Sequence, residues 1–214
     1  ILLEKLPEDS PLREHVLKIE RAALRCRESV STLLKFSRQK EYEYTETDVN
    51  EIIRSVLFIA DSELKAYNIK VKNFFDENLP KVKVSVPHIQ QAVLNIINNS
   101  IQAIAENKES LSENFINIKT YLVELEDEDD KHKKYVAMEF QDSGCGIEKE
   151  NFKLIFEPFF TTKNKNRFAG MGLSITKDII FHHKGKITVM SEGKGKGATF
   201  IIYLPLSKDE KIKT

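Results

Sequence analysis

Two asparagines, Asn95 and Asn99, lie four residues apart in "LNIINNSIQAI", a segment whose apolar residues follow helical spacing. Residues four apart share one face of a helix, so the two amides would project side by side. An amide oxygen is a hard, neutral ligand, which suits Mg²⁺ that keeps waters and phosphate oxygens around it. The pair indicates a magnesium–phosphate site, although two asparagines on a helix are more often capping or packing groups.

The run "DSGCGI" offers a second polar group at the end of a predicted strand. Its Asp142 carboxylate can accept a hydrogen bond from an exocyclic amine such as that of adenine. Gly144 and Gly146 allow the backbone to approach a ligand closely. The pattern is weak evidence by itself, because ordinary turns have the same composition.

Three more segments follow in order, and each is unremarkable alone. "FEPFFTTK" groups phenylalanines around a proline in what is otherwise a loop. "AGMGLSI" places Gly170 and Gly172 before a helix whose N-terminal amides can meet phosphate. "GKGKGATF" is a glycine-rich turn before the last strand. The order and spacing of all five segments together favour a nucleotide site.

The elements that must position these residues can be read from periodicity. Residues 12–40 predict one long helix with a narrow apolar stripe, which favours a hairpin that pairs with a second copy in a four-helix bundle. Its apolar positions follow heptad spacing: Leu12, Val16, Ile19, Ala23, Cys26, Val30 and Leu33.

The remainder of the chain alternates between helical and strand periodicity. The predicted fold class is α+β, a two-layer α/β sandwich with a mixed sheet of about five strands and helices on one face. Helices are expected near residues 48–66, 87–106 and 171–182, with Asp48 as the N-cap of the first. Strands are expected at 68–76, 81–86, 114–126, 133–142, 185–193 and 197–206.

Composition excludes several classes of function. The 214 residues carry 33 basic and 33 acidic side chains, and this balance argues against a nucleic-acid partner or contact with a membrane surface. Cys26 and Cys145 show no metal-binding spacing and are expected to be free thiols. No apolar run approaches the length of a membrane span. We expect a cytoplasmic piece of a longer chain, because Ile1 and not Met comes first; membrane anchoring of the full-length protein is left open.

The five segments resemble the motifs of bacterial sensor histidine kinases, in their catalytic and ATP-binding region. This region shares its fold with the gyrase, Hsp90 and MutL ATPases. "LNIINNS" matches the N box, "DSGCGI" the G1 box, "FEPFFTTK" the F box, "GMGLSI" the G2 box and "GKGATF" the G3 turn. The resemblance implies a Bergerat ATP-binding domain at residues 43–214. Residues 1–42 would be the C-terminal part of a dimerisation and phosphotransfer hairpin.

The resemblance assigns roles to the polar residues. Asn99 would bind Mg²⁺, and Asn95 would lie beside the phosphates of ATP. Asp142 would bind the N6 amine of adenine, in a pocket shaped by Gly144, Gly146 and Ile147. Thr199, under the G3 turn, would reach adenine through water.

The segment between the G1 and G2 boxes would be a mobile lid over the nucleotide. Phe156, Phe159 and Phe160 would anchor it by burying their rings, and Thr162 and Lys163 would lie near the ligand. Lys163 and Asn95 are the residues expected to act in catalysis. The triphosphate would be framed by Gly170, Met171, Gly172 and Leu173. The G2 box departs from the family pattern at Phe168 and Ala169, which replace a glycine and a threonine.

The implied function is that of a kinase core. It would bind Mg-ATP and, in the intact protein, phosphorylate a histidine for relay to an aspartate of a response regulator. The acceptor helix is expected to be missing except for its end at residues 1–6. His15 does not fit the acceptor, because Val16 follows it where the family has an acidic residue.

Two other functions stay open. A clamp ATPase of the gyrase type would need a glutamate base where Asn95 stands, and an amide cannot take a proton from water. A degenerate module that only dimerises would explain the altered G2 box. It would not explain why Asn99 and Asp142 are retained, since a scaffold needs no polar pocket.

Overall fold

The computed structural model describes residues 7, 10, 12–19, 42–107, 113–126, 132–162 and 170–206. The chain divides into two units, one of residues 1–41 with Phe159–Met171 and one of Tyr42–Pro158 with Gly172–Thr214. In the first unit residues 12–19 are helical, as predicted, and the rest of the expected helix lies outside the described residues. Leu12 and Ile19 of the predicted stripe are exposed.

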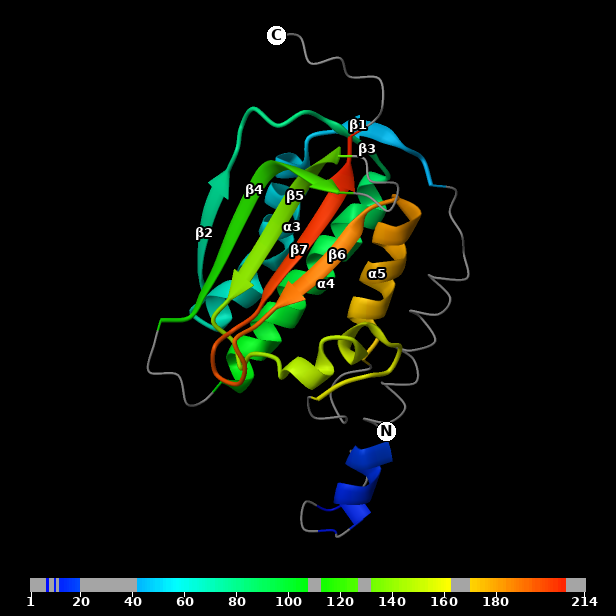
Figure 1. Ribbon diagram of the computed structural model, residues 1–214. Coiled ribbons are helices and arrows are strands. Elements are labelled where there is room, and N and C mark those ends of the chain that lie inside the picture. Colours follow the sequence, from blue (N-terminus) through cyan, green and yellow to red (C-terminus); the bar gives the residue numbers. More distant parts are fainter. Residues whose placement is uncertain are drawn as a thin grey trace. The chain divides into compact units, whose positions relative to one another are not determined.

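The second unit is built on a five-stranded mixed sheet in the order β2-β4-β5-β7-β6 (Figure 1). Only β2 and β4 run parallel; the other neighbours are antiparallel. The α+β fold class predicted from the sequence is therefore confirmed. The strands are β2 (Lys70–Phe75), β4 (Phe115–Glu126), β5 (His132–Asp142), β6 (Lys186–Met190) and β7 (Thr199–Pro205).

Three helices lie together on one face of this sheet: α3 (Val49–Ala66), α4 (Val86–Glu106) and α5 (Gly172–His182). Their bounds agree with the predicted ranges to within a residue. The Asp48 carboxylate caps α3 by accepting the Asn50 N–H at 2.8 Å. Pro87 lies in the first turn of α4, where its missing N–H costs nothing.

A small second sheet pairs β1 (Thr45–Thr47) with β3 (Val82–Val84). The strand at β3 was predicted, but it does not belong to the main sheet, and β1 was not predicted at all. Three residues with two threonines carry too little periodicity to be recognised. Two 3-10 turns, η1 (Lys149–Asn151) and η2 (Leu154–Phe156), follow β5.

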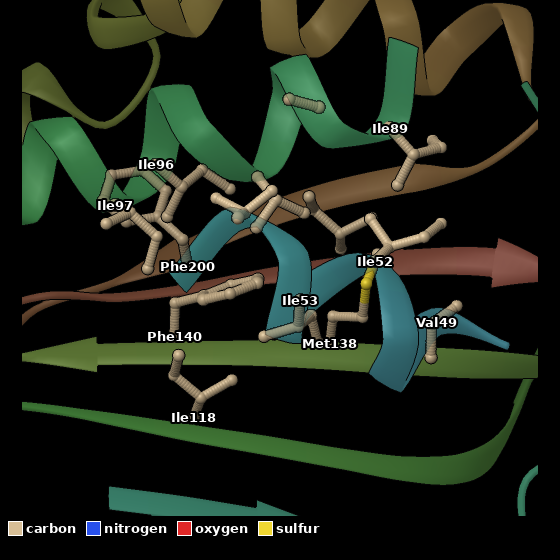
Figure 2. Close-up of a cluster of buried hydrophobic side chains, with 14 of the residues drawn as sticks. Val49, Ile52, Ile53, Ile89, Ile96, Ile97, Ile118, Met138, Phe140 and Phe200 are labelled. Atoms are coloured by element: carbon tan, nitrogen blue, oxygen red, sulfur yellow. The ribbon is translucent and has the colours of Figure 1, made fainter. Parts of the chain in front are cut away.

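The hydrophobic core fills the space between helices and sheet, and Figure 2 shows isoleucines of α3 and α4 pointing toward aromatic and aliphatic side chains of the strands. Burying each such side chain contributes about 1.5–3 kcal/mol. The core therefore fixes α4, the N-box helix, against the strands that precede the G1 loop and follow the G3 turn. The labelled residues are Val49, Ile52, Ile53, Ile89, Ile96, Ile97, Ile118, Met138, Phe140 and Phe200.

Aromatic rings gather where the described part of the second unit begins. The ring of Tyr42 stacks on His88 with centroids 4.0 Å apart and on His182 at 5.3 Å. It also meets the edge of His183 at 5.5 Å. These rings join the segment before β1 to the start of α4 and the end of α5.

His183 is held as a neutral imidazole. Its Nε2 accepts the Ser85 N–H at 3.0 Å, so that nitrogen carries no proton, and Nδ1 lies 2.7 Å from the Ile179 carbonyl. The side chain is only 5% exposed. Burial is the main cause that lowers the pKa of His183, and burial followed by the charge of His182 lowers the pKa of His88.

We predict that the free energy of unfolding falls as the pH drops below about 6.5, the ordinary pKa of histidine in an unfolded chain. Because the folded pKa values of His88 and His183 are lowered, the unfolded chain takes up protons first. The stability from the neutral rings is complete above about pH 6.5 and is lost as the pH falls through the lowered values. Urea denaturation at a series of pH values measures the slope.

The matched control is His132, an exposed histidine at the start of β5. His183→Gln should flatten the pH dependence, whereas His132→Gln should keep the slope of the parent. A parental slope in His183→Gln would contradict the prediction.

Candidate nucleotide site

Asp142 is the last residue of β5, and its side chain is 3% exposed. Its Oδ1 accepts the N–H of Gly144 at 2.8 Å and that of Ala198 at 3.3 Å. Its Oδ2 accepts the hydroxyl of Ser100 at 3.2 Å. The carboxylate is thus held by the loop after it, by the residue before β7 and by α4. A carboxylate fixed in this way is presented to a ligand in one defined direction.

The loop of Gly144–Ile147 is joined to the glycine-rich turn before β7 by backbone hydrogen bonds. The N–H of Gly197 donates to the Gly144 carbonyl at 3.1 Å, and that of Gly195 donates to the Cys145 carbonyl at 2.7 Å. Gly146 has φ +74°, and a Cβ there would overlap the carbonyl oxygen of Gly193. Glycine is required at this position because the two loops approach so closely.

Two residues outside the predicted set support these loops. The Ser191 hydroxyl accepts the Ile147 N–H at 3.0 Å and donates to the Gly197 carbonyl at 2.6 Å. Asn107, at the end of α4, donates to the Ser143 and Gly144 carbonyls, both at 3.1 Å. Nothing in the local sequence distinguishes this serine or this asparagine from surface residues, so sequence analysis missed them.

Asn95 and Asn99 both lie on α4, as predicted, and each is partly exposed. The Asn95 Nδ2 donates to the Gly172 carbonyl at 3.0 Å and to the Thr176 hydroxyl at 3.3 Å. The structure therefore brings the N box together with the first turn of α5. Leu173, the next residue, packs partly buried against the core.

Thr199 lies differently from the other predicted residues. It pairs with Gln141 in the β5–β7 register, while Ala198 provides the N–H that contacts Asp142. Side chains alternate along a strand, and the neighbours Ala198 and Phe200 belong to the core, so the Thr199 side chain faces the opposite side of the sheet. A contact of Thr199 with a base stays a prediction that this register does not favour.

The predicted lid residues fall into several parts of the structure. Phe156 packs partly buried against the core of the second unit, as expected of an anchor. Phe159 is 63% exposed with φ +65°, and Thr162 is exposed; both belong to the first unit, as do Gly170 and Met171. Lys163, Phe168 and Ala169 lie outside the described residues.

Gly170 lies against the backbone of Phe159 and Phe160, because a Cβ there would be 2.6 Å from the Phe160 carbonyl oxygen. The two ends of the 160–170 segment therefore meet within the first unit. Gly172 differs, since a Cβ there would be at ordinary contact distance, 3.8 Å, from the side chain of Asn95.

A metal ion at this site would need oxygen ligands of the amide type. In the part of the chain that the structure describes, no group of three or more histidine, cysteine or carboxylate side chains could hold a metal. The two amides of α4 fit Mg²⁺, which needs few protein ligands when phosphate oxygens and waters complete its shell.

Comparison with known proteins shows to which family the chain belongs. A family described as "Histidine kinase-, DNA gyrase B-, and HSP90-like ATPase" matches residues 85–208, which include α4, the G1 loop, α5 and the glycine-rich turn. The chain belongs to this ATPase family. Within the family its relatives are histidine kinases, so the resemblance stated from the motifs is confirmed.

One curated relative of this chain is the sensory histidine kinase/phosphatase NtrB of Vibrio alginolyticus. The two are 32% identical over 206 residues, which cover 96% of this chain and 56% of NtrB. The chain spans between 22% and 41% of the length of several other curated kinases that it matches.

Solved structures of histidine kinases share the fold of this chain. The catalytic domain of the kinase ThkA is 30% identical with a TM-score of 0.61, covering 76% of this chain and 97% of that one. ThkA in complex with the response regulator protein TrrA is 28% identical with a TM-score of 0.69, covering 95% of this chain and 54% of that one. None of the helices in the described part of the chain is both long and apolar enough to cross a membrane.

We predict that Gly146→Ala destabilises the fold more than Gly195→Ala. The two glycines have nearly equal φ values, +74° and +75°, so both substitutions cost about 1–2 kcal/mol of backbone strain. Only at Gly146 does the new methyl group also meet the Gly193 carbonyl, which adds about 1–3 kcal/mol. Thermal and urea denaturation of both variants measure the difference; equal losses would show that the loops can separate at little cost.

Proposed function

We propose that the chain is the kinase core of a sensor histidine kinase. It binds Mg-ATP and, in the intact protein, presents the γ-phosphate to a histidine for relay to a response-regulator aspartate. The observation that carries the proposal is the buried Asp142 carboxylate. It accepts hydrogen bonds from the G1 loop, from the residue before β7 and from α4. The activity proposed is that of a longer protein, because the curated relatives are much longer than this chain.

Asp142 is suited to bind the adenine amine. Backbone N–H groups of Gly144 and Ala198 donate to its Oδ1, and the Ser100 hydroxyl donates to its Oδ2. A carboxylate oxygen that is held in one orientation can accept from an exocyclic amine, and a site built for such a bond rejects bases that lack it. Gly144 and Gly146 would line the same pocket.

Asn99, with Asn95 beside it, would hold Mg²⁺ together with the phosphates. When bound, Mg²⁺ neutralises charge on the transferring phosphoryl group. The protein itself contributes mainly position, by keeping nucleotide and acceptor in line. Lys163 would add a positive charge near the γ-phosphate.

Asn95 also favours a kinase over a clamp ATPase. A hydrolase of the gyrase type needs a general base to take a proton from water, and an amide cannot serve. In a kinase the nucleophile is the acceptor histidine, whose neutral nitrogen needs no such base. The site therefore favours transfer to a protein over hydrolysis.

We predict that Asp142→Asn weakens ATP binding at least about tenfold without unfolding the protein. Asparagine keeps the shape and can keep an oxygen toward the Gly144 and Ala198 N–H groups. Its nitrogen then replaces Oδ2 and opposes the adenine amine, donor against donor. Calorimetric titration with ATP gives the affinity, and parental affinity in Asp142→Asn would remove this residue from base recognition.

The same titration of the parent chain separates the two enzymatic functions. Saturation followed by a flat baseline would support a kinase core without its acceptor. Saturation followed by steady heat release would mean hydrolysis and would favour the clamp ATPase. No binding heat would support the degenerate module.

We also propose that the parent protein is a homodimer through the helical hairpin and that a response regulator receiver domain is its partner. Leu12 and Ile19 support this, because they are 60% and 67% exposed on the described helix and would be covered by a second copy. ThkA, a relative, has been solved in complex with a response regulator protein.

We predict that Leu12→Glu with Ile19→Glu converts a dimer of this chain to a monomer in light scattering. The charges would have to be buried without partners in the seam, which costs several kcal/mol. Glu14→Lys with Lys18→Glu reverses an exposed ion pair on the same helix and should leave the mass unchanged. A dimer that survives the first pair of substitutions would place the interface elsewhere.

A further inference from the structure

The Asn95 side chain is held by two groups of a helix that lies 77 and 81 residues further along the chain. Its Nδ2 is 3.0 Å from the carbonyl oxygen of Gly172 and 3.3 Å from the hydroxyl of Thr176. Gly172 belongs to the G2 box, whereas Thr176 lies one turn later and belongs to none of the five motifs. Thr176 is fully buried.

The chemistry of these partners fixes the orientation of the amide. A carbonyl oxygen can only accept, so the Asn95 atom that faces Gly172 has to be the nitrogen. The Thr176 hydroxyl donates its own hydrogen to the same Gly172 carbonyl at 2.9 Å, and therefore also acts as an acceptor toward Asn95. Turning the amide over would place its oxygen against two acceptors.

The two acceptors of the Asn95 nitrogen lie close together, because the Thr176 hydroxyl is itself bonded to the Gly172 carbonyl at 2.9 Å. Both therefore hold the nitrogen end of the amide from one side, which fixes where the carbonyl oxygen lies. That oxygen is the atom that can bind Mg²⁺ or accept from a metal-bound water. Asn95 thus acts on the metal side of the nucleotide.

We propose that Thr176 is a positioning residue of the nucleotide site. Its hydroxyl, together with the Gly172 carbonyl, fixes Asn95 so that oxygen and not nitrogen is offered to the metal–nucleotide complex. Thr176 does not contact the ligand; it acts through Asn95. The inference rests on the proposed function, because it assigns a residue to the magnesium-dependent part of ATP binding.

Packing alone does not account for a threonine here. The position is buried on the face of α5 that includes Ile179 and Ile180, where valine has the same shape and no hydroxyl to desolvate. Threonine needs partners at such a position, and it finds one on its own helix and one on α4. The second bond links the Asn95 amide to a side chain of α5, and it therefore joins the two helices.

Calorimetric titration of Thr176→Val with ATP, once with Mg²⁺ and once in EDTA, tests the proposal. Valine keeps the shape but removes one of the two acceptors of Asn95, so the amide is held less firmly by the Gly172 carbonyl alone. We expect the ratio of the affinities with and without Mg²⁺ to fall about three- to tenfold, the effect of one hydrogen bond, while the affinity in EDTA stays within about twofold. Thr176→Ser keeps the hydroxyl and should restore the parental ratio.

Thr188→Val is the matched control, since it makes the same chemical change at an exposed position of β6. A parental ratio in Thr176→Val, or an equal loss with and without Mg²⁺, would overturn the proposal. Thermal melting shows whether each variant is folded, and Thr176→Ala replaces Thr176→Val if the latter is not. A parent chain that does not bind Mg-ATP would contradict the proposed function, whereas normal binding by both parent and variant contradicts the positioning role alone.

A second measurement needs no nucleotide. In the ¹H–¹⁵N spectrum of the ligand-free chain, the two side-chain amide protons of Asn95 can be assigned by their loss in Asn95→Asp. They should shift and exchange faster with water in Thr176→Val and stay in place in Thr176→Ser and Thr188→Val. Unchanged Asn95 signals in Thr176→Val would show that the hydroxyl does not hold the amide.

Discussion

The burial of one face of α4 is the constraint on which the rest of the structure depends. This face carries apolar side chains along the whole helix, packed against α3 and the sheet, and it leaves Asn95 and Asn99 on the partly exposed side. A rotation of the helix by one residue would bury the asparagines and expose isoleucines, at a cost of several kcal/mol. The hydrophobic core therefore sets the direction in which the polar groups of the N box face.

A second set of contacts depends on that placement. Ser100, on the buried side of α4, reaches the Asp142 carboxylate, and Asn107 at the end of the helix holds the loop that follows. The glycine-rich turn then closes on this loop through backbone hydrogen bonds, which require glycine where the two chains meet. The orientation of the Asp142 carboxylate is thus set jointly by α4, β5 and the residue before β7, and no one of these segments could fix it alone.

The contact between α4 and the first turn of α5 has a different physical basis, because an amide, a hydroxyl and a backbone carbonyl satisfy one another there. Hydrogen bonds in such a cluster have direction, and the direction decides which atom of Asn95 a ligand meets. Hydrophobic packing places the helix, whereas this small network determines whether the oxygen or the nitrogen of the Asn95 amide would face a ligand.

Much of the fold could be predicted from the sequence because the patterns are local. Helical spacing in residues 86–106, the Asp48 cap and the alternation in the long strands each depend on a few neighbouring residues. The five ordered motifs likewise identified the family. β1 escaped prediction because three residues hold too little pattern, and its partner β3 joins it in a separate sheet only through long-range pairing.

The sequence by itself determined which residue types are available at the site: two amides on one helical face, a carboxylate after a strand and glycines at the turns. Only the tertiary structure decided how they are used. It showed that the Ala198 N–H meets Asp142, that Ser191 and Asn107 support the loops, and that Thr176 contacts Asn95. These contacts join residues from 36 to 81 positions apart, and the register and helix packing that create them arise only when the core closes.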